Sequence, residues 1–290
     1  MKLIRTYFKT LSQLAPDQAG KQALKLFCTP RKLSPRAREE DFLQKARLEH
    51  VPYSRGSMPV YHYGPDDGPL LLLVHGWESR AGSMGGLAYH LSEQGYHIVA
   101  PDLEAHGKHS PMATNLFRMS EGLNAVLDHL GPKEPYSVVS HSFGSSVACY
   151  TLGQRADKID QLILLTSPNV MIELVHIFQQ QIGLTKKGAS AMIRHFDRWT
   201  GHRMEFLRVA DFCLKIPYED LSIIHDKKDR VLPYYTSASL AAALPRSSML
   251  PVQGIGHYKM LWHAEILETV GHILELSGGK KQALAGLSLP

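Results

Sequence analysis

The 290-residue sequence contains little cysteine and no long hydrophobic run. Its three cysteines, Cys28, Cys149 and Cys213, are odd in number and far apart, which matches neither a disulfide framework nor a metal-binding spacing. We therefore expect a reducing, cytoplasmic compartment. No segment approaches the roughly 20 apolar residues that span a bilayer. Arg5 and Lys9 interrupt the apolar residues near the amino terminus, so the sequence does not predict a signal peptide.

The composition also lacks any strong bias outside the first fifty residues. The net charge is +5, but residues 1–50 contain 11 Lys or Arg against 5 Asp or Glu, which leaves 21 against 22 in the remaining 240. No nucleic-acid-binding motif accompanies this basic excess, so we expect no nucleic-acid partner. With 44% hydrophobic and 20% charged residues, the chain is predicted to form a large globular domain with an ample core.

The amino-terminal segment combines apolar and basic residues at helical spacing. A stripe recurs with the period of a helix, and Lys2, Arg5 and Lys9 lie off it; the stripe consists of Ile4, Tyr7, Phe8, Leu11 and Leu14. The pattern favours a helix docked on the main domain with a solvated basic face. A weak contact of residues 1–16 with an anionic membrane surface is the alternative.

From about residue 57 the sequence alternates short strand-like runs with helical patterns. This alternation predicts an α/β fold with a mostly parallel central sheet flanked by helices. The runs LLLLV and VVS are apolar on both faces, as expected of strands buried between two helical layers. The predicted strands are Pro59 to Tyr63, Leu70 to Val74, His97 to Pro101, Tyr136 to Ser140, Gln161 to Thr166, Leu221 to His225 and Ser248 to Val252.

The interval between the fifth and sixth of these strands is too long for a simple crossover. Its content is helical, with one apolar stripe from Met171 to Ile182 and another from Met192 to Trp199. An insertion at the carboxyl edge of a parallel sheet can cover a ligand pocket. We therefore predict four parts, which are a basic helical extension (1–56), the α/β core (57–167 and 220–277), a helical cap insertion (168–219) and a loose tail (278–290).

The segment SHSFG is typical of a tight turn between a strand and a helix with a serine at its tip. Such a turn needs small residues two positions before and after the serine, because the backbones approach closely there. Ser142 has Ser140 before it and Gly144 after it, whereas Ser140 and Ser145 have larger neighbours at these positions. Ser142 is therefore the candidate nucleophile, although a glycine is commoner than Ser140 at its position.

A nucleophilic serine needs a general base and an acid that orients the base. The predicted strand at Leu221 is followed by Asp226 and Asp229, and the last predicted strand is followed by His257. The chain order of serine, aspartate and histidine matches that of one particular fold. Either aspartate could be the acid on this pattern alone.

Four motifs together make the chain resemble the α/β-hydrolase superfamily over residues 57–277. They are VHGW (74–77), PDLEAHGKHS (101–110), SHSFG (140–144), and HDKKDRVLP together with GIGHYKML. The segments LFCTPRK and HGWESRAGSM further resemble a group of uncharacterised bacterial hydrolases. The resemblance implies that Asp229, which precedes a hydrophobic residue and proline, is the acid rather than Asp226. It also implies an oxyanion hole formed by the backbone N–H groups of Trp77 and Phe143.

The resemblance assigns structural roles to the other strand-end polar residues. Asp102 is expected to organise the following loop through backbone hydrogen bonds, and His75 to brace the oxyanion loop. His106 and His109 with Asp102 match no zinc signature, so we expect no metal. His141 is expected to point away from the reaction and to have no role.

The predicted function is that of a serine hydrolase, with Ser142, Asp229 and His257 as the catalytic residues. The expected substrate is a carboxylic ester or thioester with a small to medium apolar acyl group, cleaved through an acyl-enzyme without a cofactor. A cofactor-independent carbon–carbon hydrolase or an acyltransferase of the same fold is an alternative. A catalytically silent binding or membrane-associated protein is another. The sequence predicts neither the substrate's identity nor the oligomeric state.

Overall fold

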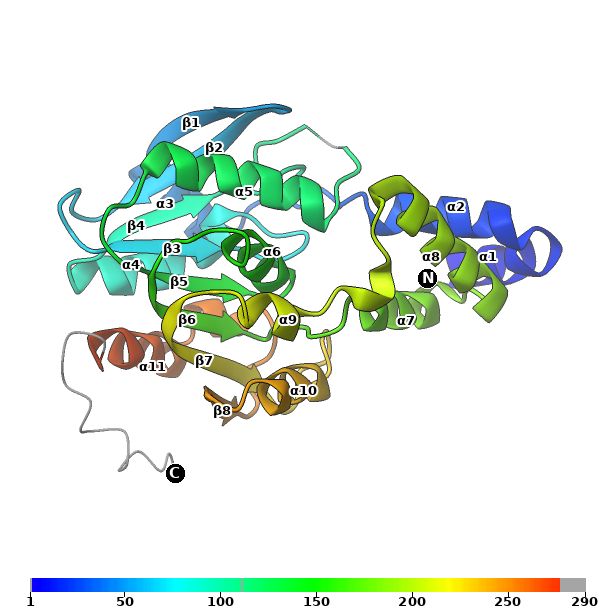
Figure 1. Ribbon diagram of the computed structural model, residues 1–290. Helices are drawn as coiled ribbons and strands as arrows, with labels where there is room; N and C mark the ends of the chain where they lie inside the picture. The colour runs from blue at the N-terminus through cyan, green and yellow to red at the C-terminus, as the bar shows by residue number, and fades with distance from the viewer. Residues whose placement is uncertain (1, 111, 277–290) are drawn as a thin grey trace.

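The computed structural model describes residues 2–110 and 112–276 and contains one eight-stranded sheet (Figure 1). The strand order is β1-β2-β4-β3-β5-β6-β7-β8. β1 pairs antiparallel with β2, and β2 antiparallel with β4, whereas all other neighbours are parallel. The strands are β1 (Arg47–Tyr53), β2 (Gly56–Tyr63), β3 (Leu70–Val74), β4 (His97–Pro101), β5 (Tyr136–His141), β6 (Ile159–Leu165), β7 (Tyr218–Asp226) and β8 (Ser247–Val252).

The mostly parallel α/β fold predicted from the sequence is confirmed, and every predicted strand lies within or overlaps an observed one. One observed strand, β1, was not predicted, and it lies in the segment where we expected a helical extension. It is an edge strand in which Val51 is the one buried residue, so its sequence carries almost no hydrophobic alternation. Pairing with β2 through the turn at Ser54 and Arg55 makes this segment a strand. The predicted tail, residues 278–290, lies outside the described residues.

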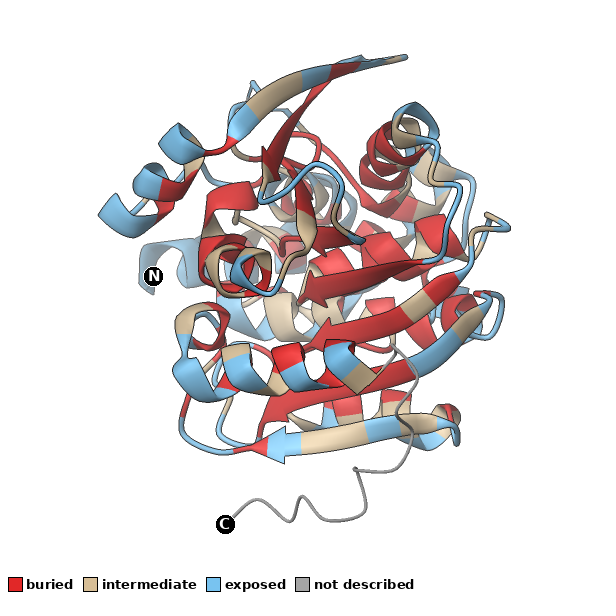
Figure 2. Ribbon diagram, turned by 90° about the vertical axis from the view of Figure 1, so that its left-hand side faces the viewer, coloured by how far each residue is buried: buried red, intermediate tan, exposed pale blue. Residues whose placement is uncertain are grey.

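Helices cover both faces of the sheet, so that its central strands are buried (Figure 2). One face is covered by α3 (Ala37–Lys45), α4 (Gly85–Glu93) and α11 (Ala264–Glu275). The other is covered by α5 (Leu116–Leu130), α6 (Phe143–Leu152), α9 (Val209–Cys213) and α10 (Tyr235–Ala243). Every residue of β5 is buried, which explains its continuous apolar run.

The cap is built from two segments that are far apart in the sequence (Figure 1). The insertion contributes α7 (Met171–Ile182) and α8 (Lys186–Thr200), and the amino terminus contributes α1 (Lys2–Leu14) and α2 (Pro16–Phe27). A Cβ added to Gly20 of α2 would lie 2.5 Å from the backbone nitrogen of Met192 in α8, so these helices approach closely. We call these four helices the cap.

This arrangement corrects the expectation that the amino-terminal helix docks on the main domain. The guanidinium of Arg5 donates a hydrogen bond of 2.6 Å to the carbonyl oxygen of Gln180, at the end of α7. The backbone N–H of Thr185 donates to the Ser12 hydroxyl at 3.2 Å. The helix therefore docks on the cap insertion. The apolar stripe of α1 is only partly covered, since Phe8 is buried while Leu14 is 80% exposed.

An extended connecting segment (residues 28–36) joins the amino-terminal helices to the core. Arg31 donates two side-chain hydrogen bonds to the carboxylate of Glu78, with N···O distances of 2.8 and 2.6 Å. The backbone N–H of Thr114 donates to the carbonyl oxygen of Cys28 at 2.8 Å. These contacts attach the cap beside the loop that follows β3. Among the described residues no helix is long and apolar enough to cross a membrane.

Candidate active site

Ser142 occupies a strained turn between β5 and α6. Its backbone has φ 53° and ψ −128°, a left-handed conformation that non-glycine residues seldom adopt. The turn is tight, because a Cβ added to Gly144 would lie 2.2 Å from the carbonyl oxygen of His75. A Cβ added to Gly76 would lie 3.0 Å from the Cβ of Ser142. Small residues around Ser142 are thus required by close packing, and the strain exposes its hydroxyl at the carboxyl edge of the sheet.

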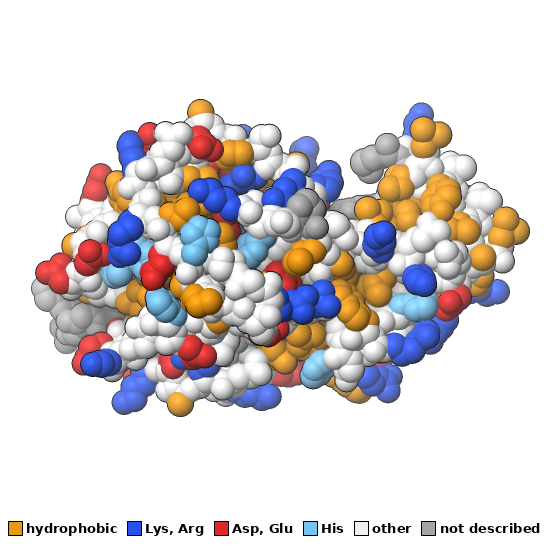
Figure 3. All heavy atoms as spheres, turned by 90° about the horizontal axis from the view of Figure 1, so that it is seen from above, with side chains coloured by type: hydrophobic (Ala, Val, Ile, Leu, Met, Phe, Trp, Pro, Cys, Tyr) orange, Lys and Arg blue, Asp and Glu red, His pale blue; other side chains and the backbone are white. Residues whose placement is uncertain are grey.

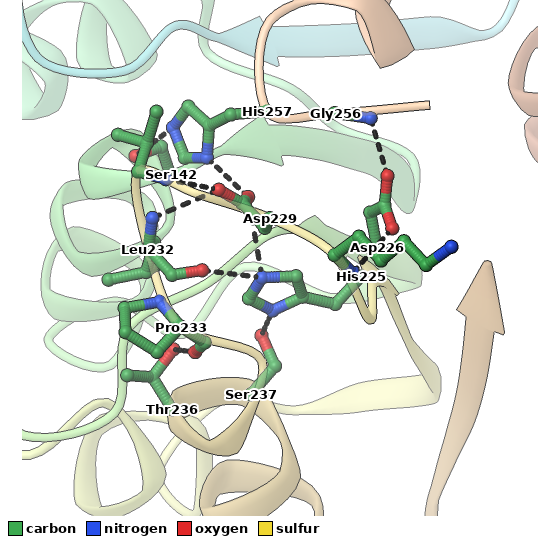
Figure 4. A network of polar contacts seen from close by, with 12 residues as sticks. Ser142, His225, Asp226, Asp229, Leu232, Pro233, Thr236, Ser237, Gly256 and His257 are labelled. Carbon is green, nitrogen blue, oxygen red and sulfur yellow. Dashed lines mark hydrogen bonds and ion pairs between the residues drawn. The ribbon is translucent and has the colours of Figure 1, made fainter. Parts of the chain in front are cut away.

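His257 lies in the loop after β8 and contacts both Ser142 and Asp229 (Figure 4). Its Nε2 is 3.1 Å from the Ser142 Oγ, and its Nδ1 is 2.7 Å from an oxygen of Asp229. Because an ionised carboxylate only accepts hydrogen bonds, Nδ1 carries the proton and Nε2 is free to accept one from the serine hydroxyl. The three residues form a continuous hydrogen-bonded chain.

The carboxylate of Asp229 is buried and held on several sides. Its Oδ1 accepts hydrogen bonds from the backbone N–H groups of Val231 and Leu232, at 2.7 and 3.0 Å. Burial alone would raise the pKa of Asp229, but hydrogen bonds from His225 and His257 outweigh it and hold this pKa well below its usual range. Asp229 is therefore a stable anion against which an imidazolium could form.

Asp226, the rival acid, does not contact His257. Its carboxylate accepts hydrogen bonds from the backbone N–H groups of Lys228 and Gly254, at 2.7 and 3.0 Å, and from that of Gly256. Figure 4 shows this side chain directed away from the imidazole of His257. Asp226 thus ties the loop after β7 to the loop that carries His257.

The sequence did not single out His225, which is the second histidine beside Asp229 (Figure 4). This fully buried side chain places Nε2 3.4 Å from the Asp229 Oδ2 and 3.0 Å from the carbonyl oxygen of Leu232. Its Nδ1 is 2.7 Å from the hydroxyl of Ser237. Since the Leu232 carbonyl can only accept, Nε2 carries a proton that also faces Asp229. The position of His225 at the end of a predicted strand, four residues before Asp229, was the available signal.

His141 has a contact where we expected none. Its Nε2 is 2.9 Å from the backbone carbonyl oxygen of His257, so the ring supports the loop that carries the candidate base. Sequence reasoning missed this contact because it joins residues 116 positions apart.

The loop after β3 is held beside Ser142 by His75. The buried ring places Nδ1 2.8 Å from the carbonyl oxygen of Gly76 and accepts a 2.9 Å hydrogen bond from the backbone N–H of Leu103 at Nε2. Burial lowers the pKa of His75 to about 4, so the ring is neutral, as this bonding requires. His75 therefore braces the loop that carries Trp77. The indole of Trp77 packs edge-on against Phe143, with ring centroids 5.6 Å apart.

Asp102 organises the neighbouring loop, as expected. Its carboxylate accepts hydrogen bonds from the backbone N–H groups of Ala81 at 2.8 Å and Lys108 at 3.0 Å. The ring nitrogens of His106 and His109 face the carbonyl oxygens of Glu104 and Asp102. In the part of the chain that the structure describes, no group of three or more His, Cys, Asp or Glu side chains could hold a metal ion.

Ser142 opens into an apolar pocket of about 630 Å³ between the core and the cap. Trp77, Phe143 and Leu232 line its core side. Phe27 and Phe178 meet edge-on in its cap side, with centroids 5.1 Å apart, although they come from different segments of the cap. The lining from the cap and the connecting segment includes Ile4, Leu26, Phe27, Cys28, Met171, Leu174, Ile177, Phe178, Ile182 and Phe196.

Known proteins match this chain in sequence and in structure. Residues 69–205 match the model of a protein family described as alpha/beta hydrolase fold. Lipase LipV of Mycobacterium tuberculosis is 38% identical over 108 residues, which are 37% of this chain and 40% of that protein. Epoxide hydrolase 3 of Siraitia grosvenorii is 28% identical over 124 residues, 41% of this chain and 39% of that protein. These matches span about two fifths of the length of either relative.

The solved structures extend the likeness to the whole fold. The esterase Pf2001 of Pyrococcus furiosus superposes with a TM-score of 0.64 at 15% identity, and the match covers 85% of this chain and 96% of that one. At this identity the likeness establishes the fold alone. Together with the family model, it confirms the resemblance inferred from the four sequence motifs.

Proposed function

We propose that this chain, whose residues 69–205 match the alpha/beta hydrolase fold family, is a serine hydrolase of carboxylic esters or thioesters. The observation that carries the proposal is the hydrogen-bonded chain Ser142–His257–Asp229 at an apolar pocket. A buried carboxylate, an imidazole and a serine hydroxyl in this order are the parts that nucleophilic acyl transfer needs.

In the proposed first step, the Ser142 oxygen attacks the carbonyl carbon of the substrate. His257 accepts the serine proton at Nε2, and Asp229 stabilises the resulting imidazolium through Nδ1. The tetrahedral intermediate collapses when His257 gives this proton to the leaving alcohol or thiol, which leaves an acyl ester on Ser142. Water then attacks the acyl carbon with His257 as base, and release of the acid regenerates the serine hydroxyl.

The oxyanion is proposed to be bound by the backbone N–H groups of Trp77 and Phe143. Both residues flank Ser142 in the pocket wall, and Phe143 is the first residue of α6, where the helix dipole favours negative charge. Loss of one such donor typically costs on the order of a hundredfold in rate. The brace formed by His75 is therefore important for activity as well as for the loop's shape.

The pocket favours an apolar acyl group of moderate size. Its volume of about 630 Å³ lies within the range of small-molecule sites, and most lining residues are aliphatic or aromatic. Because the cap supplies much of this lining, the substrate's acyl part is proposed to lie between the cap and Ser142. The partner is accordingly a small molecule, and the reaction needs no cofactor.

A reducing compartment is proposed from the cysteines. Cys28, Cys149 and Cys213 are all free and buried, and the Sγ atoms of Cys149 and Cys213 lie 3.5 Å apart, joined by a hydrogen bond and not by a disulfide. Burial raises the pKa of the Cys28 thiol to about 12, so this cysteine is not a reactive thiolate.

Turnover of a panel of chromogenic esters and thioesters with acyl chains of increasing length tests the proposal. We expect measurable kcat/KM for several apolar acyl groups and loss of turnover in Ser142→Ala. Absence of turnover on every member, in a chain that still reacts with a serine-directed probe, would favour a carbon–carbon hydrolase or an acyltransferase. Absence of both reactions would favour a silent binding protein.

A further inference from the structure

We propose that the cap binds the surface of an anionic phospholipid bilayer, through the apolar side of α1 and a basic groove at the start of α8. The proposed binding goes beyond the hydrolase function and does not depend on it. The observations that support it are the charge of the cap, the lining of the groove and the exposure of apolar side chains around it.

The cap carries the positive excess of the whole chain. Its four helices contain nine Lys or Arg and three Asp or Glu, whereas the rest of the chain contains 23 Lys or Arg and 24 Asp or Glu. The cations are Lys2, Arg5, Lys9, Lys21, Lys25, Lys186, Lys187, Arg194 and Arg198. The fold brings together two basic segments that are distant in sequence, so one end of the molecule attracts anionic surfaces.

Three of these cations line a shallow groove. Lys186, Lys187 and Arg194 form it together with Pro16 and Ser190. All three cations are exposed, and none forms an ion pair with an acidic side chain within residues 2–110 and 112–276. Lys186 and Lys187 also occupy the first turn of α8, where the helix dipole disfavours positive charge. An anionic group bound in the groove would offset both the mutual repulsion of the three cations and the unfavourable interaction of the two lysines with the helix dipole.

Apolar side chains lie exposed beside this groove. Leu3, Tyr7 and Leu14 share one side of α1 and are 88%, 49% and 80% exposed. Leu14 ends α1 two residues before Pro16, which itself lines the groove. Figure 3 shows hydrophobic side chains gathered on the outer surface of the cap, with Lys and Arg side chains along one edge. A helix with apolar residues exposed next to cations is typical of binding at the interface of an anionic membrane.

The apolar surface of the cap is continuous with the pocket. Ile4 and Leu26 line the pocket and are also 37% and 40% exposed on α1 and α2. A bilayer bound to the cap would thus lie beside apolar residues that lead to Ser142. If the proposed hydrolase function holds, this geometry favours esters that partition into membranes, and this consequence alone rests on that function.

Sedimentation of the full chain with vesicles tests the binding. We expect the chain to sediment with vesicles of phosphatidylcholine and phosphatidylglycerol, much less with phosphatidylcholine alone, and less at high salt. Neutralising the groove in Lys186→Gln/Lys187→Gln/Arg194→Gln should weaken binding on the order of a hundredfold, since each basic residue near such a surface contributes about fivefold.

A matched control carries the same charge change at the opposite end of the sheet. Lys133, Lys158 and Lys215 precede β5, β6 and β7 and are exposed, so Lys133→Gln/Lys158→Gln/Lys215→Gln should retain most of the binding. The contribution of the apolar side chains is tested by Leu14→Gln, which is expected to weaken binding roughly tenfold. Its control is Leu214→Gln, because Leu214 is 68% exposed but lies outside the cap.

Labelling of Ser142 by a serine-directed probe, measured without vesicles in every variant, separates this proposal from the hydrolase function. The variants should label like the unmodified chain, because none of the changed residues lines the pocket. Equal loss of binding in the groove variant and its control would overturn the proposal. So would binding to soluble heparin without binding to anionic vesicles, which would identify a polyanion site instead.

Discussion

The carboxylate of Asp229 lies between two histidines, with its Oδ2 2.7 Å from the Nδ1 of His257 and 3.4 Å from the Nε2 of His225. His257 faces Ser142, whereas His225 is fixed on its far side by Leu232 and Ser237. The Asp229 carboxylate is therefore oriented from both sides, and its hydrogen bond to Nδ1 in turn orients the imidazole of His257. Substitutions of His225, Asp226 and Asp229, which lie close together in the sequence, are therefore expected to affect activity and stability differently.

Asp229→Asn should lower kcat by about four orders of magnitude, because an amide cannot stabilise the imidazolium and can select the wrong tautomer of His257. Asp226→Asn should reduce kcat far less but lower stability by about 1–3 kcal/mol, since an amide nitrogen cannot accept the backbone N–H bonds that Asp226 receives. Ester kinetics and urea unfolding of both variants check this pair. A larger kinetic effect of Asp226→Asn would reassign the acid.

His225→Gln should lower kcat roughly tenfold with little change in KM, because it loosens Asp229 without touching the pocket. Removing the His225 contact should also raise the pKa of Asp229, since this hydrogen bond is one of the groups that lower it. The pH profile of kcat distinguishes this role from a purely structural one. A variant with reduced stability but an unchanged kcat would contradict it.

Stability should fall as the pH is lowered from about 6.5 to 5. Burial lowers the pKa of His75 to about 4 and that of His106 to about 3, from an ordinary value of 6.5. The unfolded chain therefore binds these protons first, and each histidine reduces stability by about 2 kcal/mol at pH 5. Urea unfolding at pH 7.5 and pH 5 measures the difference.

The matched variant for this pH dependence is His106→Gln. Its free energy of unfolding should fall less between pH 7.5 and pH 5 than that of the wild-type chain. The His106 ring makes one hydrogen bond to a backbone carbonyl, and its buried Nε2 has no hydrogen-bond partner among residues 2–110 and 112–276, so glutamine can replace it more readily than it could replace His75. An unchanged pH dependence in this variant would show that other groups cause the loss.

Phe178→Ala should enlarge the pocket and raise the preference for longer acyl chains by roughly tenfold, because the ring contacts Phe27 across the cap side of the pocket. Phe206→Ala is the control, since Phe206 is 66% exposed and lies outside the pocket lining. The ratio of kcat/KM for long and short acyl esters is the measurement. An equal change in both variants would place the acyl group elsewhere.

The sequence predicted the hydrogen-bonded chain because its members lie at the ends of strands. In a parallel sheet these ends share one edge, so Ser142, Asp229 and His257 could be brought together from local patterns alone. The two candidate acids could not be separated by spacing. Their difference arises from the loop after β7, which turns Asp229 toward His257 and Asp226 toward Gly256.

Other features depend on long-range packing that local patterns do not encode. The amphipathic pattern of α1 predicted a helix, but not that it would pack on the cap insertion through Arg5 and Ser12. β1 was missed because an edge strand with one buried residue has no clear alternation. His141 was missed because its contact is with a backbone carbonyl in a distant loop.

The most direct test of the proposed nucleophile is intact-mass analysis after reaction with a fluorophosphonate, which requires no knowledge of the substrate. We predict one covalent adduct on the wild-type chain, none on Ser142→Ala, and one on Ser145→Ala, which changes a buried serine of the same turn. Absence of an adduct on the folded wild-type chain, or an adduct that persists in Ser142→Ala, would contradict the assignment of Ser142 as the nucleophile.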